Sequence, residues 1–258
     1  MIQKKIAVVV SLFLLLTSCA TTKPEPPSSL TQYQSQELNW QECHQNYQCA
    51  TLLVPINYAD LSVGAFSLAV LRYPALDQAH RIGSLVVNPG GPGASGVIYA
   101  YNAENIVSPE ILERFDIVGF DPRGVGESAP IKCLSDAETD ASFAADPKPD
   151  DAVELDQLIS DAQEYFKKCA ANTKYLNDYS TLNSARDLEI LRSALGDQKL
   201  NYLGKSYGTY LGTLYSELFP GSVGRFVLDG AVDPNSSNRD ALLGQAIGFD
   251  LALNAIYH

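Results

Sequence analysis

The sequence has little of several residue types, and each shortage argues against a class of function. Only 3 of the 258 residues are histidine, and no two cysteines have the C-x-x-C spacing, so we predict no zinc-type metal site. Lysine and arginine number 18 against 30 aspartates and glutamates, which gives a net charge of −12. No basic stripe is present, and the acidic balance argues against nucleic acid as a partner. We expect neither a metal nor another cofactor.

A segment long enough to cross a membrane is also missing. The most apolar stretch, residues 6–16, follows Lys4 and Lys5 and would span about 16 Å as a helix, about half of a hydrocarbon core. Positive residues before a short apolar segment are typical of a signal peptide. The sequence LTSC at residues 16–19 resembles the lipobox of bacterial lipoproteins, which implies cleavage before Cys19 and a lipid on its thiol. An ordinary signal peptide or an uncleaved anchor is the alternative.

These features predict how the N-terminal part is organised. Residues 1–18 are the expected lipoprotein signal peptide, and residues 19–36 the expected flexible tether, because Thr, Pro, Ser and Gln dominate there. We therefore expect an exported protein that is held at the cell envelope by the lipid on Cys19.

The cysteines predict disulfides. If Cys19 carries a lipid, Cys43, Cys49, Cys133 and Cys169 remain, and an even number in an exported protein is typical of disulfide bonding. Three connectivities are possible, and we predict the local one, Cys43–Cys49 with Cys133–Cys169. Chain-entropy reasoning gives the longer loop about 4 kcal/mol of stabilisation.

From residue 49 onward, strand-like and helix-like segments alternate, which predicts an α/β fold with a mostly parallel sheet flanked by helices. The first two strands are expected to be antiparallel neighbours. For one helix, Ser180 or Thr181 is the expected N-cap and Gly196 the stop signal. The expected strands lie within residues 49–58, 65–73, 83–91, 115–124, 200–204 and 224–232. The third runs into a glycine-rich turn, and the fourth is ended by the turn at residues 121–124. The expected helices are 151–171, 180–196, 207–219 and 238–257.

A serine lies between two glycines where a strand meets a helix. Residues 204–208, GKSYG, fit G-x-S-x-G, a turn that projects a nucleophilic serine hydroxyl from the top of a sheet. The helix that follows directs its first amides at the same place. A phosphate-binding loop would need a glycine where Lys199 stands. A plain turn without chemistry is the other alternative to Ser206 as a nucleophile.

A second glycine cluster, NPGGPGASG at residues 88–96, favours acyl transfer. That reaction needs two backbone donors for the negative oxygen, and we expect the amides of Gly91 and Tyr207 to supply them. The alternative is a dinucleotide-binding turn, because residues 91–96 match G-x-G-x-x-G and Asp121 follows the next strand. That alternative leaves the turn at Ser206 unexplained.

These motifs together resemble a known family. CATLLVPINY, NPGGPGASG, FDIVGFDPRGVGESAP, NYLGKSYGTYLGTLYSELFP and GRFVLDGAVDP occur in this order and resemble secreted α/β-hydrolase peptidases of the tripeptidyl aminopeptidase and prolyl aminopeptidase group. The match covers about residues 40–240. The resemblance implies an α/β-hydrolase fold, Ser206 as nucleophile and the Gly91 and Tyr207 amides as oxyanion hole. It also implies a peptide substrate, from whose N-terminus short peptides or single residues are released through an acyl-enzyme.

One part of the family pattern has no counterpart here. In this group the acid and the histidine follow a helical cap domain. We expect residues 37–234 to be the N-terminal part of the hydrolase core and residues 235–258 the start of the cap. We expect this chain to be a portion of a longer protein that is completed by a missing C-terminal segment or a second chain. Because the acid and the base are absent from it, we expect it to be inactive alone.

Few residues of this chain could replace the missing acid and base. His44, His80 and His258 are expected in loops or at the end of the chain, and none is expected to act as the base. Asp229 is a possible acid because it follows a strand, and Asp233 is a less favoured one with a turn or cap role.

The sequence also suggests roles for three residues near the motifs and leaves two alternatives to a peptidase. Arg123 in the sequence DPRG is expected to be structural, whereas Lys205 and Tyr207 flank the serine and could touch substrate. The alternatives to a peptidase are an esterase or lipase-like hydrolase with the same nucleophile, and a catalytically silent binding lipoprotein.

The disulfide prediction can be tested directly. Mass spectrometry of the non-reduced protein is expected to find Cys43 joined to Cys49 and Cys133 joined to Cys169. Free thiols at all of these positions would contradict it.

Overall fold

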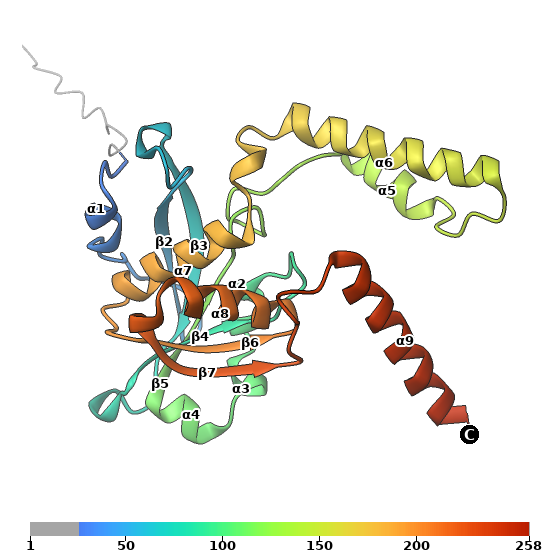
Figure 1. Ribbon diagram of the computed structural model, residues 1–258. Coiled ribbons are helices and arrows are strands. Elements are labelled where there is room, and N and C mark those ends of the chain that lie inside the picture. Colours follow the sequence, from blue (N-terminus) through green and yellow to red (C-terminus); the bar gives the residue numbers. More distant parts are fainter. Residues whose placement is uncertain (1–25, 258) are drawn as a thin grey trace, which may run out of the picture.

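The computed structural model describes residues 26–257 and contains a seven-stranded sheet with helices on both faces (Figure 1). The strands are β1 (Gln41–His44), β2 (Tyr47–Pro55), β3 (Ala65–Tyr73), β4 (Gly83–Asn88), β5 (Phe115–Phe120), β6 (Leu200–Lys205) and β7 (Val223–Asp229). The α-helices are α1 (Leu30–Gln34), α2 (Gly96–Ala100), α3 (Ala103–Ile106), α4 (Pro109–Arg114), α5 (Asp136–Ala144), α6 (Ala152–Asn172), α7 (Thr181–Ala194), α8 (Tyr207–Leu218) and α9 (Asn238–Tyr257). The short 3-10 helices are η1 (Leu61–Val63), η2 (Gln78–His80), η3 (Leu176–Asp178) and η4 (Pro220–Ser222).

The strand order is β1-β2-β3-β5-β4-β6-β7. β2 and β3 are antiparallel neighbours, as the sequence predicted, and β3 is also antiparallel to β5. β5, β4, β6 and β7 run parallel to one another, so their carboxyl ends share one edge of the sheet. The fold is therefore the expected α/β type with a mixed sheet whose second half is parallel.

Alternating side chains of the strands form two hydrophobic cores. On one face Val86 and Val118 pack with Leu188 of α7 and with residues of α1 and α8. On the other face Val87 and Ile117 pack with residues of α2, α3 and α4. Both faces of the parallel strands are thus covered, which explains why every residue of β5 is buried.

The prediction of a flexible tether over residues 19–36 is wrong for the last part of that segment. Residues 30–34 form α1, whose Tyr33 is fully buried in the core. The Gln36 side chain exchanges two hydrogen bonds with the backbone of Leu53 in β2, at 2.8 and 2.9 Å. The buried ring of Tyr33 and the side-chain amide of Gln36 therefore hold this segment on the core, although its composition indicates flexibility. The signal peptide and Cys19 lie outside the described residues.

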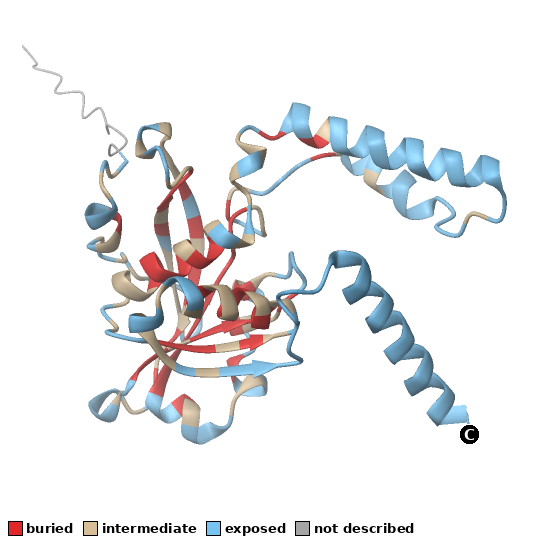
Figure 2. Cartoon of the chain, in the orientation of Figure 1, coloured by how far each residue is buried: buried red, intermediate tan, exposed pale blue. Residues whose placement is uncertain are grey.

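The structure pairs the cysteines as predicted. Cys43–Cys49 joins β1 to β2, and Cys133–Cys169 closes the base of a helical arm, residues 133–172, which contains α5 and α6. The arm projects from the core and is mostly exposed, and α9 also extends away from the sheet (Figures 1 and 2). Apolar side chains of α6 are consequently exposed, with Phe166 at 69%. Within residues 26–257 no helix combines the length and apolar character needed to cross a bilayer.

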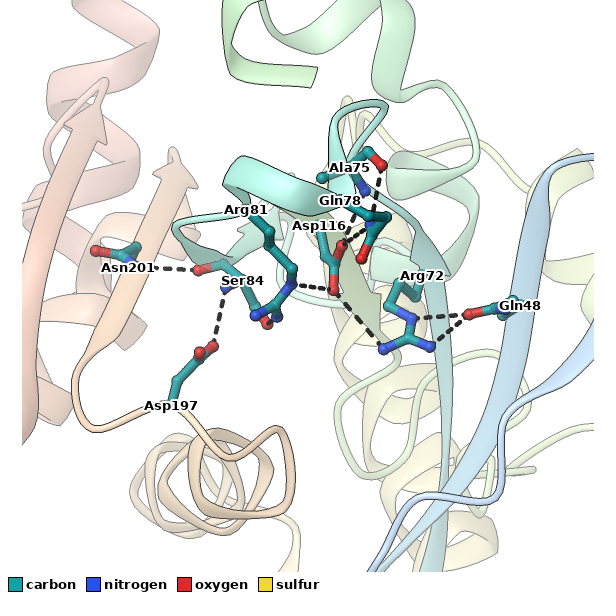
Figure 3. Close-up of polar contacts among 9 residues, drawn as sticks. All are labelled: Gln48, Arg72, Ala75, Gln78, Arg81, Ser84, Asp116, Asp197 and Asn201. Atoms are coloured by element: carbon teal, nitrogen blue, oxygen red, sulfur yellow. Dashed lines mark hydrogen bonds and ion pairs between the residues drawn. The ribbon is translucent and has the colours of Figure 1, made fainter. Parts of the chain in front are cut away.

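A buried carboxylate organises the amino edge of the parallel strands, opposite the edge that carries Ser206 (Figure 3). Asp116 accepts hydrogen bonds from the Ala75 amide at 2.8 Å and from Arg81 Nε at 2.8 Å, and it lies 3.7 Å from Arg72. Because Asp116 is only 2% exposed, these charged and polar partners compensate its loss of water.

A second buried ion pair lies on the Ser206 side. Arg123 and Asp187 of α7 both have fully buried side chains and form two hydrogen bonds, at 2.6 and 2.8 Å. The remaining guanidinium donors bind the carbonyl oxygens of Pro55, Ile56 and Asp178. Arg123 thus joins the loop after β5 to β2 and α7. These contacts agree with the structural role that was expected of Arg123.

Asp187→Ala should therefore destabilise the fold strongly. It would leave the Arg123 charge buried without a carboxylate, and we expect the free energy of unfolding to fall by about 3–5 kcal/mol in urea denaturation. The matched control is Glu164→Ala on α6, which removes an exposed partner 3.7 Å from Lys167 and should change stability by less than about 1 kcal/mol. Equal effects of the two substitutions would contradict this account.

Candidate active site

Ser206 occupies a strained turn between β6 and α8. Its backbone has φ 53° and ψ −122°, a conformation that costs about 1–3 kcal/mol for a residue other than glycine. The Ser206 N–H donates to the Asp229 carbonyl at 2.8 Å, and its carbonyl accepts from the N–H and hydroxyl of Thr209 at 2.8 and 2.7 Å. The Ser206 side chain is exposed and makes no capping hydrogen bond to α8, so its hydroxyl is available.

The glycines on either side of Ser206 are required by close backbone contacts. A Cβ on Gly204 would lie 2.5 Å from the Gly208 carbonyl oxygen. A Cβ on Gly208 would lie 2.8 and 2.9 Å from two oxygens of Asn88 at the end of β4. A side chain at Gly204 would push α8 away from β6, and one at Gly208 would push α8 away from β4, which explains the spacing of the G-x-S-x-G motif.

The glycine loop after β4 lies directly against this turn. Gly90 has φ +97°, and a Cβ there would lie 3.1 Å from both the Ser206 Cβ and the Tyr207 nitrogen. The Gly90 N–H donates to Asn88 Oδ1 at 2.9 Å and is therefore occupied. Among the residues that the structure describes, the Gly91 and Tyr207 amides have no hydrogen-bond acceptor. Both expected donors are thus unpaired, and the residue before Gly91 lies against the serine turn.

The acidic candidates on the β7 side serve other partners. Asp229 ends β7, and its carboxylate lies 3.8 Å from Lys205 Nζ while its side chain is 64% exposed. Asp233 accepts from the Asn235 amide at 2.9 Å, which is the turn role expected of it.

Neither described histidine reaches the serine. His44 packs edge-on against Tyr101 near the β1–β2 hairpin. His80 lies in the η2 segment before β4 and hydrogen bonds to Asp77 at 2.7 Å. His258 lies outside the described residues. Within residues 26–257, no histidine is therefore hydrogen bonded to Ser206.

The dinucleotide-binding alternative is contradicted by the contacts of Asp121. Its carboxylate accepts from the Ser95 hydroxyl at 2.6 Å, the Val97 amide at 3.1 Å and the Glu127 amide at 3.1 Å. Asp121 is only 2% exposed, so no ribose could reach it. Gly96 instead permits α2 to touch β5, because a Cβ there would overlap the Phe120 carbonyl. No group of His, Cys, Asp and Glu suited to a metal is found among the described residues.

A cavity that the sequence did not predict lies beside Tyr207. We call it the Tyr207 cavity; it is open to solvent, has a volume of about 320 Å³ and is lined by the loop after β4, the loop after β5 and the start of α7. The Tyr207 and Thr181 hydroxyls hydrogen bond at 2.7 Å across its wall. Burial raises the pKa of the Tyr207 phenol, so this hydroxyl is neutral. Three separate loops form the cavity, and no single motif could have revealed it.

The fold and the serine turn together define a class of protein. A family model described as alpha/beta hydrolase fold matches residues 83–257. The chain therefore belongs to the α/β-hydrolase fold family.

Individual relatives are also similar to this chain. It is 43% identical over 210 residues to the serine protease Hip1 of Mycobacterium tuberculosis, with 80% of this chain and 40% of that protein covered. It is 40% identical over 219 residues to the tripeptidyl aminopeptidase of Streptomyces lividans, with 81% and 40% covered. Carboxylesterase B of M. tuberculosis is 42% identical over 213 residues, with 80% and 40% covered. The chain spans about 40% of the length of these relatives.

Gly208→Ala tests the close approach of α8 to β4. The added methyl would overlap Asn88, and we expect the free energy of unfolding to fall by about 1–3 kcal/mol. The control is Gly221→Ala, where nothing lies within 4 Å of the new Cβ and stability should change by less than about 0.5 kcal/mol. A Gly208→Ala protein as stable as the parent in chemical denaturation would contradict the described contact.

Proposed function

We propose that the protein is a serine hydrolase, a peptidase that releases short peptides or single residues from peptide N-termini through an acyl-enzyme. The observation that carries the proposal is the exposed Ser206 in its strained turn, followed by the unpaired Tyr207 amide and packed against the glycine loop that contains the unpaired Gly91 amide. In the proposed reaction the Ser206 oxygen attacks the substrate carbonyl, and the carbonyl oxygen becomes negative between these amides. Each such donor is worth about 3–4 kcal/mol of barrier.

The reaction also needs a general base. A serine hydroxyl is a poor nucleophile at neutral pH unless a base removes its proton. We propose that a histidine outside the described residues takes this proton and later gives it to the leaving amine, with an acid that orients the histidine. The greater length of the relatives supports this division. In the same proposal, residues 37–234 are core and α9 begins a cap.

The relatives support a peptidase more than an esterase. Two are named as a serine protease and a tripeptidyl aminopeptidase. The carboxylesterase relative has nearly the same identity, so an esterase with the same nucleophile is the second candidate. Both candidates use the same groups at Ser206 and differ only in the leaving group.

We further propose that the protein is exported and anchored at the cell envelope by a lipid on Cys19. The LTSC sequence at residues 16–19 supports lipidation. The two disulfides support an oxidising compartment, because disulfides persist outside the cytosol. The membrane is then a partner only through the lipid.

The proposal predicts a strict dependence on Ser206. In enzyme isolated from the cells that produce it, Ser206→Ala should lower kcat/KM for a tripeptidyl-anilide at least about 10³-fold, because the nucleophile is lost. Ser142→Ala, at an exposed serine of α5, should leave the rate within about twofold. An anilide turnover that survives Ser206→Ala would contradict the proposed nucleophile, and ester turnover without any anilide turnover would favour the esterase.

The origin of the base gives a separate prediction. Purified residues 19–258 should turn over anilides slowly or not at all, because neither described histidine contacts Ser206. Steady turnover by this polypeptide, abolished by Ser206→Ala, would show that the base is already present in it.

A further inference from the structure

We infer that the Tyr207 cavity is the subsite for the side chain of the residue whose carbonyl is attacked, and that it takes an uncharged side chain. This inference rests on the proposed function and adds to it a preference for one part of the substrate.

The cavity begins at the proposed oxyanion hole. Gly90 and Tyr207 both line it, and Gly90 lies so close to the serine turn that a Cβ there would be 3.1 Å from the Tyr207 nitrogen. A carbonyl group whose oxygen binds the Gly91 and Tyr207 amides therefore has one of its two substituents at the mouth of the cavity.

The order of the strands decides which substituent this is. Ser206 follows β6, which has β4 on one side and β7 on the other. The cavity lies toward β4 and β5, since its walls are the loops that follow these strands. Strands added later in the chain can extend the sheet beside Ser206 only at β7, because the opposite edge is β1.

The proton donor to the leaving amine therefore comes from the β7 side. The acid and histidine of this fold follow the serine in chain order, and the histidine must stand next to the amine that it protonates. The leaving amine thus departs toward β7. The acyl residue, on the other side of the carbonyl, faces the Tyr207 cavity.

The lining offers no charge to a bound side chain. Its one charged member is Arg123, whose side chain is fully buried and whose donors are all used by Asp187 and three carbonyl oxygens. Val125, Ile131 and Tyr179 supply apolar wall. The polar lining, from Asn88, Ser180, Thr181, Ser184 and Tyr207, is neutral. A lysine or glutamate side chain would lose water here without gaining a partner of opposite charge, which is unfavourable.

The size of the cavity fits the same conclusion. About 320 Å³ is near the lower limit for sites that hold small molecules. That volume suits one side chain rather than a long acyl chain. Ile131, which is 36% exposed and touches Gly124 at the cavity wall, is therefore well placed to limit how large the side chain can be.

The test compares tripeptidyl-anilides that differ only in the residue before the anilide, in enzyme isolated from its own cells. We expect kcat/KM for leucine to exceed that for lysine and for glutamate at least about 10-fold. Ile131→Phe, which fills the cavity, should lower the leucine-to-alanine ratio of kcat/KM about 10-fold, and Ile131→Ala should lower discrimination against larger side chains. Leu76→Ala is the control, because Leu76 is 62% exposed and its N–H donates to the Leu112 carbonyl beyond the amino edge of the sheet. The ratios of kcat/KM among the anilides should be the same for this variant as for the parent.

Each other outcome overturns the inference. Equal rates for leucine, lysine and glutamate would show that the lining does not select, and unchanged ratios in both Ile131 variants would show that the side chain binds elsewhere. If the Ile131 variants instead alter selectivity for the residue after the scissile bond, the cavity is on the leaving-group side. In these cases Ser206-dependent turnover would leave the proposed function standing, whereas no turnover of any anilide would overturn both.

Discussion

The close approach of two backbone segments is the constraint on which the candidate site depends. The loop after β4 and the turn between β6 and α8 touch closely, and this contact is possible only because Gly90 and Gly208 have no side chain. Asn88 takes the Gly90 N–H, whereas the Gly91 and Tyr207 amides, the donors that we propose for an oxyanion, have no acceptor among the described residues.

The strain at Ser206 is small compared with the interactions that surround it. Its backbone conformation costs about 1–3 kcal/mol, and its hydrogen bonds to Asp229 and Thr209 offset this at about 0.5–1.5 kcal/mol each. The buried pair of Arg123 and Asp187 holds the neighbouring loop and α7 in place. The serine turn is therefore held in its conformation by hydrogen bonds and by well-fixed neighbouring elements, and a substrate does not have to order it.

Local patterns predicted most of the parallel sheet and the serine turn, because strands 83–91, 115–124 and 200–204 are apolar segments with clear turn residues after them. Ser180 was one of two expected N-caps, and its hydroxyl accepts from the Asn183 amide. The sequence could not predict that α1 packs on the core, since that depends on the single buried ring of Tyr33. It also could not predict the Tyr207 cavity, because residues far apart in the chain form its walls.

The disulfide at the base of the helical arm has a consequence for resistance to proteolysis. The connection between α5 and α6 is exposed, and such loop tips are preferred sites of cleavage by proteases. Cys133 and Cys169 lie on opposite sides of that connection. A single cut there would interrupt the chain without releasing either piece, so the nicked molecule would keep its arm and the covalent continuity between β5 and α7.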